Sequence, residues 1–503
     1  MIKLIYRIES DYMSKKRMLI VTSVTLSVVT ISLGIVKLYQ TYALSNYIGT
    51  VTDTGIDVYI NDDSYASIPA NGSSNVYYML TNTNPGTVKY GVAYQTTSGV
   101  TVKVYDTSED PATGTIEEND KKYIKLHLEN KNSTNKTIEL STVLGYENGG
   151  DLVVPSGVTL VTDTYTPPPT AAEYITKLYT TASKTTVTNN SITYNTAPSV
   201  SLMNDRLGGT TTDLDGGNIR YYGASPNNYI YFNCSDYSNQ TSSTCETWRI
   251  IGVFDGKLKL IRGSQIGTYS WDNKNTSTGA ENNYGKNDWT TARLMKLLNP
   301  SDYYTVDSND NNLGQSLYYN STSGKCYSGQ NNATKDCDFT STGIKDTTRN
   351  MIAETTYYLG GWNNVSVYPN QIYEYERGTT VYTGRPTTPW TGKIALAYPS
   401  DYGYAADLNQ CVNKQLNKYN DSTCTSNNWM KAIITNNGSN YGWLLTPGSS
   451  ASYSVWYVYS SGYVYSNGNA SIANGAVPVL SLSSELGIGS GDGSSSNPYK
   501  LSA

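Results

Sequence analysis

The chain has 503 residues with 36 basic and 41 acidic side chains, and only 15% of its residues are charged. Six basic and two acidic residues lie in residues 1–45, which leaves 30 basic and 39 acidic residues after them, a net charge of −9. This balance excludes the basic stripe that nucleic-acid binding requires. The single histidine, His127, argues against histidine-dependent catalytic triads and Cys/His metal sites.

The N-terminal segment predicts a membrane anchor. Residues 18–36 are uncharged, and nineteen residues in a helix would span roughly 28 Å, close to the hydrocarbon thickness of a bilayer. Lys15, Lys16 and Arg17 directly precede this run. We therefore expect residues 1–17 to be a cytoplasmic basic tail and residues 18–37 a single transmembrane helix, with the bulk of the chain extracellular. The alternative is a signal peptide cleaved near residues 42–45, which would export the same bulk.

Residues 46–165 predict an all-β domain of the immunoglobulin-like sandwich type. Short runs with alternating or β-branched residues are separated by turn signals such as Asn71-Gly72 and Asn84-Pro85-Gly86. The runs are residues 56–60, 76–80, 88–92, 100–104, 123–128 and 137–140. In residues 123–128, Ile124, Leu126 and Leu128 are expected to face the core, and His127 the solvent. A stiff proline linker, residues 166–170, ends this stalk-like domain.

Residues 171–485 predict a larger α+β head. Thr170 and Glu173 have capping-box spacing and open a short helix, and Asp255-Gly256 predicts a hairpin turn between two apolar strands. Further helices are expected at residues 288–300 and 344–359, and strands return at residues 441–445, 455–459, 463–465 and 477–480. The Gly/Ser-rich residues 486–503 are typical of a flexible tail.

All cysteines lie in this head and form three close couples, with 10, 10 and 12 residues between the partners. Six cysteines allow 15 connectivities, but such couples suit local disulfides and an oxidising exterior. The couples are Cys234 with Cys245, Cys326 with Cys337, and Cys411 with Cys424.

Few residues indicate catalysis. The best carboxylates for a glycosidase-like pair are Glu374 and Glu376, which would share one face of a strand, with Asp401. The run beginning at Asp307 starts like a calcium loop, but it lacks glycine at the sixth position and has Tyr318 at the twelfth. A polar loop is the better interpretation, and no metal or cofactor is expected.

Residues 443–480 carry the pattern that points to binding. Between apolar ends they consist almost wholly of Tyr, Ser, Asn, Gly and Trp, in a chain with 47 tyrosines and 3 phenylalanines. Rigid amphipathic rings beside small hydrogen-bonding residues are the composition of antibody paratopes. The alternative is a solvent-facing strand pair in a tyrosine-rich protein. The candidate ligand-binding residues are Trp456, Tyr457, Tyr459, Tyr463 and Tyr465.

Residues 443–448 (WLLTPG) and 475–482 (GAVPVLSL) resemble the closing strands of bacterial C-type-lectin-like domains, which include the formylglycine-generating-enzyme-like group and ligand-binding variable proteins. Residues 218–228, 246–252 and 393–404 are further similar to an uncharacterised family of anchored surface proteins of Gram-positive gut-type bacteria. The resemblance covers roughly residues 170–503 and implies a lectin-like scaffold. The catalytic cysteine pair of the formylglycine enzymes has no match here.

These patterns together lead us to expect a non-catalytic, surface-anchored protein that binds an extracellular glycan or protein, or acts in adhesion. A secreted carboxylate-dependent hydrolase, with a cleft joining Glu374, Glu376 and Asp401, is the alternative. A structural envelope protein without a ligand is a third possibility.

Overall fold

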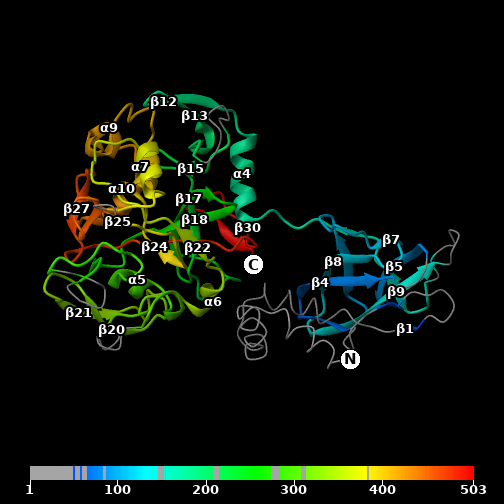
Figure 1. Cartoon of the computed structure of the whole chain (residues 1–503). Helices are drawn as coiled ribbons and strands as arrows, with labels where there is room; N and C mark the ends of the chain where they lie inside the picture. Colours follow the sequence, from blue (N-terminus) through cyan, green and yellow to red (C-terminus); the bar gives the residue numbers. More distant parts are fainter. Residues whose placement is uncertain are drawn as a thin grey trace. The chain divides into compact units, whose positions relative to one another are not determined.

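The computed structural model describes residues 49–50, 57–58, 65–82, 86–145, 152, 154–207, 215–273, 280, 282–306, 313–381 and 385–502. The chain forms two compact units that divide between Pro168 and Pro169 (Figure 1). The expected basic tail and the expected anchor at residues 18–37 lie outside the described residues. None of the helices in the described part is long and apolar enough to cross a bilayer.

The first unit is a sandwich of two β-sheets around one apolar core. One sheet has the order β10-β5-β9-β3 with β7 also paired to β5, and the other has the order β11-β6-β8-β4. Their strands are β3 (Tyr65–Ile68), β4 (Gly72–Thr81), β5 (Val88–Gln95), β6 (Val100–Tyr105), β7 (Thr113–Ile116), β8 (Lys121–Asn130), β9 (Lys136–Gly145), β10 (Val158–Leu160) and β11 (Thr164–Tyr165). The pair β1 (Gly49–Thr50) and β2 (Asp57–Val58) precedes them.

Strand β8 confirms the expected alternation in part. Ile124, Leu126 and Leu128 are fully buried between the sheets. The expectation of an exposed His127 is wrong, because β11 adds to the edge of this sheet and covers the histidine. The His127 ring stacks on Tyr165 with centroids 3.6 Å apart, and Nδ1 lies 2.7 Å from Oδ1 of Asn75. His127 is therefore part of the structure of this unit.

The second unit contains two larger sheets and several short helices. The nine-stranded sheet comprises β12 (Thr185–Asn189), β13 (Ile192–Ala197), β14 (Leu202–Asn204), β15 (Ile219–Tyr221), β16 (Tyr229–Phe232), β17 (Glu246–Phe254), β18 (Lys257–Arg262), β24 (Ile394–Ala395) and β29 (Val479–Ser481). The five-stranded sheet has the order β19 (Thr268–Ser270), β28 (Ala473–Gly475), β25 (Gly442–Pro447), β26 (Ser454–Val458) and β27 (Val464–Asn469). Three two-stranded pairs are β20 (Ser323–Tyr327) with β21 (Thr334–Asp338), β22 (Thr355–Tyr357) with β23 (Trp390–Gly392), and β30 (Gly487–Ser490) with β31 (Lys500–Ser502).

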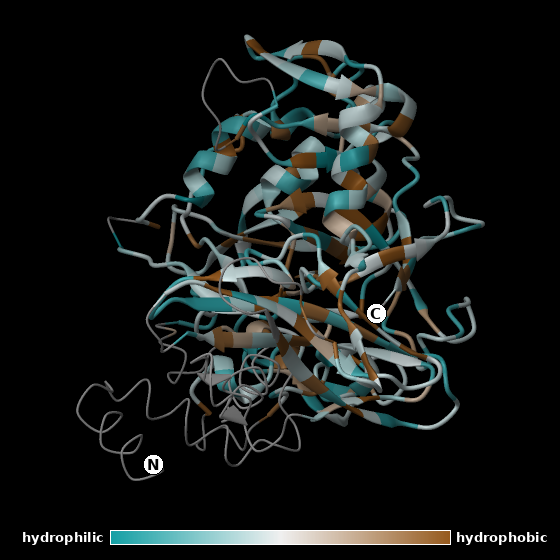
Figure 2. Ribbon diagram, turned by 90° about the vertical axis from the view of Figure 1, so that its right-hand side faces the viewer, coloured by the Kyte–Doolittle hydropathy of each residue, from teal (hydrophilic) through white to brown (hydrophobic). Residues whose placement is uncertain are grey.

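The helices of this unit are short, and they pack on both larger sheets. They are α4 (Ala171–Thr181), α5 (Arg293–Leu298), α6 (Asp346–Arg349), α7 (Pro369–Glu376), α8 (Pro399–Tyr404), α9 (Ser422–Thr425) and α10 (Trp429–Ile434). One core cluster joins α4 and α5 to both sheets, and another joins α8 and α10 to the five-stranded sheet. Figure 2 shows hydrophilic and hydrophobic residues alternating along the strands and around the helices. The expected β-rich class with few helices is thus confirmed.

Local signals in the sequence are confirmed at two elements. The side chain of Thr170 accepts a hydrogen bond from the backbone N–H of Glu173, and the Glu173 carboxylate accepts one from the backbone N–H of Thr170, which closes the capping box of α4. Strands β17 and β18 pair antiparallel around Asp255-Gly256, both of which adopt positive φ, as a tight hairpin turn requires.

Two expected helices and the tail differ from prediction. Only α5 forms in residues 288–300, because the Asp288 carboxylate bonds the hydroxyl of Thr290 and holds a turn there. In residues 344–359, the β-branched and aromatic run of β22 pairs with β23 instead of continuing α6. The tail is a hairpin rather than a flexible connector, since Tyr499 and Leu501 are buried and β31 pairs with β30.

The three cysteine couples form the three disulfides of the second unit, Cys234–Cys245, Cys326–Cys337 and Cys411–Cys424. The cysteines are buried, and each bond closes a loop of 11 or 13 residues. Loops of this length lose conformational entropy in the unfolded chain, which stabilises the fold by about 3 kcal/mol per bond. The disulfides therefore stabilise only the second unit.

We predict that dithiothreitol lowers the melting temperature of the second unit and leaves that of the first unit unchanged, because residues 1–168 contain no cysteine. The double change Cys411→Ala with Cys424→Ala should lower the free energy of unfolding by about 3 kcal/mol. Calorimetry of the full chain with and without reductant measures both effects. Equal shifts of both units, or no shift, would contradict the prediction.

Candidate functional site

The candidate carboxylates are not arranged as a catalytic pair. Pro369 at the first position of α7 and the bond from the Tyr368 N–H to Oε1 of Gln371 start a helix where a strand was expected. Two residues apart on a helix, Glu374 and Glu376 point to different sides. Glu374 is exposed and Glu376 is fully buried, so the expectation that both share one face is wrong.

The buried carboxylates are held by protein groups. Oε1 and Oε2 of Glu376 accept hydrogen bonds from the backbone N–H and the hydroxyl of Ser400, at 2.9 and 2.6 Å. Burial outweighs these bonds and raises the pKa of Glu376 from 4.5 to about 7. Asp401 is bound by Lys259 at 2.5 Å and by Arg220 at 2.9 Å, and these cations hold its pKa low against the opposing effect of burial. Glu374, Glu376 and Asp401 therefore do not form the cleft that the hydrolase hypothesis requires.

The segment expected to bind ligand forms β25, β26 and β27 of the five-stranded sheet. Side chains alternate between the two faces of a strand, so Trp456 of β26 faces the core, whereas Tyr457 and Tyr459 lie on the opposite face of the sheet. Trp456 is 0% exposed, and its indole Nε1 donates to the carbonyl of Trp362 at 2.6 Å. The prediction that Trp456 contacts ligand is therefore wrong, because this ring is part of the core under the sheet.

The four tyrosines of the prediction do come together, and a fifth, Tyr441, joins them. We call this group the tyrosine face; its members are Tyr441, Tyr457, Tyr459, Tyr463 and Tyr465. Its rings form a continuous chain of contacts with centroids between 4.1 and 6.4 Å apart. Tyr459 and Tyr465 are 38% and 37% exposed, and the other three are half-buried.

The backbone fixes these rings. Tyr457 lies opposite Tyr465 in the pairing of β26 with β27, and opposite Trp443 in the pairing of β25 with β26. Tyr457 also lies over Gly468, where a Cβ atom would come within 2.8 Å of its ring. Burial raises the pKa of the Tyr457 hydroxyl to about 12, so this residue stays neutral at physiological pH. The central ring of the face is thus rigidly placed.

No charged residue occurs between residues 441 and 480. Tyr441 stacks on Tyr459 with centroids 4.1 Å apart, and a hydrogen bond between their hydroxyls raises the pKa of Tyr441. Tyr441 was not among the predicted ligand-binding residues. It lies two residues before Trp443, which is opposite Tyr457, so strand alternation places Tyr441 on the same side of the sheet as Tyr457. The tyrosine face can offer ring contacts and neutral hydrogen bonds to a ligand.

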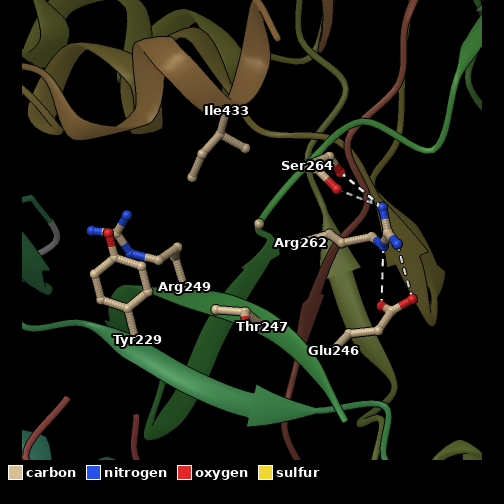
Figure 3. A pocket seen from close by; sticks show the side chains of 8 residues that line it. Tyr229, Glu246, Thr247, Arg249, Arg262, Ser264 and Ile433 are labelled. Carbon is tan, nitrogen blue, oxygen red and sulfur yellow. Dashed lines mark hydrogen bonds and ion pairs between the residues drawn. The ribbon is translucent and has the colours of Figure 1, made fainter. Parts of the chain in front are cut away.

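A separate pocket of about 380 Å³ opens on the nine-stranded sheet (Figure 3). It is lined by Tyr229, Glu246, Thr247, Arg249, Arg262, Gly263, Ser264 and Ile433. On one side of the pocket, Arg262 and Glu246 form a bidentate ion pair, in which Nη2 and Nε of Arg262 donate to Oε1 and Oε2 of Glu246 at 2.9 and 3.0 Å. Arg249 lies over Tyr229 on the other side. No signal in the sequence pointed to this pocket, because its lining comes from distant segments.

Among the described residues, no group of three or more His, Cys, Asp or Glu side chains could hold a metal ion. The calcium-like run from Asp307 to Asn312 lies outside the described residues. Comparison with protein-family models, with curated proteins and with solved structures finds no match to this chain. The immunoglobulin-like and lectin-like assignments therefore stay predictions.

We predict that the stability of the second unit falls as the pH rises from about 4.5 to 7. The folded chain keeps a proton on Glu376 that the unfolded chain releases in this range, so the stabilisation is complete below pH 4.5 and lost above 7. Between pH 4.5 and 8, the free energy of unfolding of the wild-type chain should fall by about 3 kcal/mol more than that of Glu376→Gln. Urea unfolding at pH 4.5 and 8 measures this difference. Glu374→Gln is the control and should show the same pH dependence of the free energy of unfolding as the wild-type chain. If Glu376→Gln also shows the wild-type pH dependence, Glu376 is not the group that titrates.

Proposed function

We propose that this protein binds an uncharged glycan or protein surface outside the cytoplasm through its tyrosine face. The observation that carries the proposal is the chain of five contacting tyrosine rings on one sheet, with Tyr459 and Tyr465 more than a third exposed. Tyrosine rings are rigid and amphipathic, so they bury contact area at a low cost in conformational entropy. Rings already held in mutual contact lose little further freedom when a ligand covers them.

The neutral character of the face favours ring stacking and hydrogen bonds over ion pairing. Because no charge occurs in residues 441–480, binding should depend weakly on ionic strength. The sheet surface that carries the rings is separate from the lining of the 380 Å³ pocket. An extended partner, such as an oligosaccharide chain or a protein surface, therefore suits the tyrosine face better than a small molecule.

We further propose that residues 18–37 hold the protein in the membrane as a single helix, with the N-terminus inside. The support is the uncharged run after Lys15, Lys16 and Arg17, together with three disulfides that suit an oxidising exterior. The immunoglobulin-like unit would then be a stalk, and the lectin-like unit a head that presents the tyrosine face.

We predict that Tyr459→Ala and Tyr465→Ala each weaken ligand binding about tenfold or more, because both remove an exposed ring from the face. The full chain is screened first on glycan arrays and extracellular protein panels, and the affinity for each hit is then measured at 0.05 and 0.5 M NaCl. Tyr284→Ala is the control, since Tyr284 is 39% exposed in the same unit but outside the face.

Two results would refute the binding proposal. One is the absence of any glycan or protein ligand in both screens. The other is a ligand whose affinity is the same for the wild-type chain, Tyr459→Ala and Tyr465→Ala. Tyr459→Phe separates the contribution of the hydroxyl from that of the ring.

We predict that the full chain stays in the membrane fraction after carbonate extraction, whereas a chain that begins at residue 46 is soluble. Protease added to intact cells should digest both folded units and spare residues 1–17. N-terminal sequencing of the mature protein distinguishes the two forms of export. A mature N-terminus near residue 45 with no membrane association would overturn the anchor in favour of a cleaved signal peptide.

A further inference from the structure

We propose that the pocket beside Arg249 binds the anionic group of a small molecule, a carboxylate, phosphate or sulfate. This site is distinct from the tyrosine face and does not depend on the function proposed for that face. Its volume of about 380 Å³ lies within the range of small-molecule sites. Strands β16, β17 and β18 provide most of the lining, and Ile433 of α10 contributes from the opposite side (Figure 3).

Arg249 is a buried cation without a carboxylate partner among the described residues. The residue is 6% exposed, yet its hydrogen-bond acceptors are neutral: Oδ1 of Asn228 for Nε and the carbonyl of Pro226 for Nη2. In the part of the chain that the structure describes, Nη1 has no hydrogen-bond acceptor. A guanidinium so far removed from water is costly unless an anion approaches it.

Two other arginines of this unit, Arg220 and Arg262, are paired with carboxylates. Arg220 is bound by Asp205 and Asp401, and Arg262 by Glu246, so each of these charges is neutralised inside the protein. Burial lowers the pKa of Arg249 to about 10, which leaves it protonated at neutral pH. The pocket therefore contains one positive charge that the described residues leave uncompensated.

The charges of the lining add up in favour of an anion. Glu246 would repel an anion if it were free, but its two oxygens are occupied by Nε and Nη2 of Arg262. Nη1 of Arg262 is occupied in turn by the hydroxyl and carbonyl of Ser264. With this pair neutral, the charged lining residues carry a net charge of +1, which is that of Arg249.

Two aromatic rings fix the orientation of the guanidinium. Its central carbon lies 3.7 Å from the ring centroid of Tyr229 and 4.9 Å from that of Trp429. Aromatic rings contact the face of a guanidinium and leave its edge N–H groups for hydrogen bonds. A planar edge held in this way matches the oxygens of a carboxylate, phosphate or sulfate. The exposed hydroxyl of Thr247 adds a polar group to the pocket floor.

Titration calorimetry of the full chain at low salt tests the proposal with four probes built on the same sugar ring: glucuronate, glucose 6-phosphate, glucose 6-sulfate and glucose. At least one of the three anions should bind about tenfold or more tightly than glucose, and 0.5 M NaCl should weaken that binding. The anion that binds most tightly identifies the chemical group. Equal affinity for all four probes, or no binding by any, would overturn the proposal.

Variants locate the binding. Arg249→Gln should weaken the anion about tenfold or more, the loss expected for a charge-assisted hydrogen bond. Arg377→Gln is the matched control, because Arg377 also lies over a tyrosine ring, 3.3 Å from the Tyr373 centroid, outside the pocket. Thr247→Tyr keeps Arg249 and fills the pocket from an exposed strand position, so it should weaken the anion even if Arg249→Gln fails to fold.

The variants also separate this site from the tyrosine face. Tyr459→Ala should leave anion affinity unchanged, and Arg249→Gln should leave binding of the neutral ligand unchanged. If Thr247→Tyr and a folded Arg249→Gln both bind the anion as the wild-type chain does, the pocket is not the site. Arg249 would then serve only to join β17 to Trp429 of α10.

Discussion

Two cations and two carboxylates are buried together in the second unit, and the placement of its elements depends on their pairing. Arg220 of β15 binds Asp205 and Asp401, and Lys259 of β18 binds Asp401. Removing one partner of such a group leaves an uncompensated buried charge and lowers the free energy of unfolding by about 3–5 kcal/mol. The cluster therefore fixes α8, which carries Asp401, against the nine-stranded sheet.

This constraint extends to the tyrosine face. The residues before α8 are tied to the five-stranded sheet, because the N–H of Leu445 in β25 donates to the carbonyl of Ala397 at 2.9 Å. Strand β25 pairs with β26, and β26 with β27, so the strands that carry the rings are placed by the same cluster. Ion pairing in the core thereby positions a surface that has no charge of its own.

Sequence reasoning succeeded where the signal is local and failed where distant segments decide. The capping box of Thr170 and Glu173, the hairpin at Asp255-Gly256 and the disulfides all join residues close in sequence. The helix around Glu374 and Glu376 did have a local signal, Pro369 at its first position and Gln371 at its third, which the strand prediction overlooked. The order of the tail, by contrast, depends on Tyr499 packing into the core. The inclusion of Trp456 among the ligand-binding residues was avoidable. Strand alternation already places its side chain on the face opposite to that of Tyr457 and Tyr459.

Arg249 had no signal in the sequence, because its neighbours Asn228, Tyr229 and Trp429 come from other elements. The connection between its pocket and the tyrosine face is short. Gln265 follows Ser264 of the pocket, and its Nε2 donates a hydrogen bond to the carbonyl of Ile434. Its Oε1 accepts one from the side-chain amide of Asn440, which precedes Tyr441.

The two surfaces are thus linked through the side chain of Gln265 but use different forces. Ring contacts on the neutral face persist at high salt, whereas an ion pair with Arg249 weakens when counterions compete for the guanidinium. Ionic strength therefore separates their contributions in the intact chain. A ligand retained at high salt is held by the face, and one released by salt is held by the pocket.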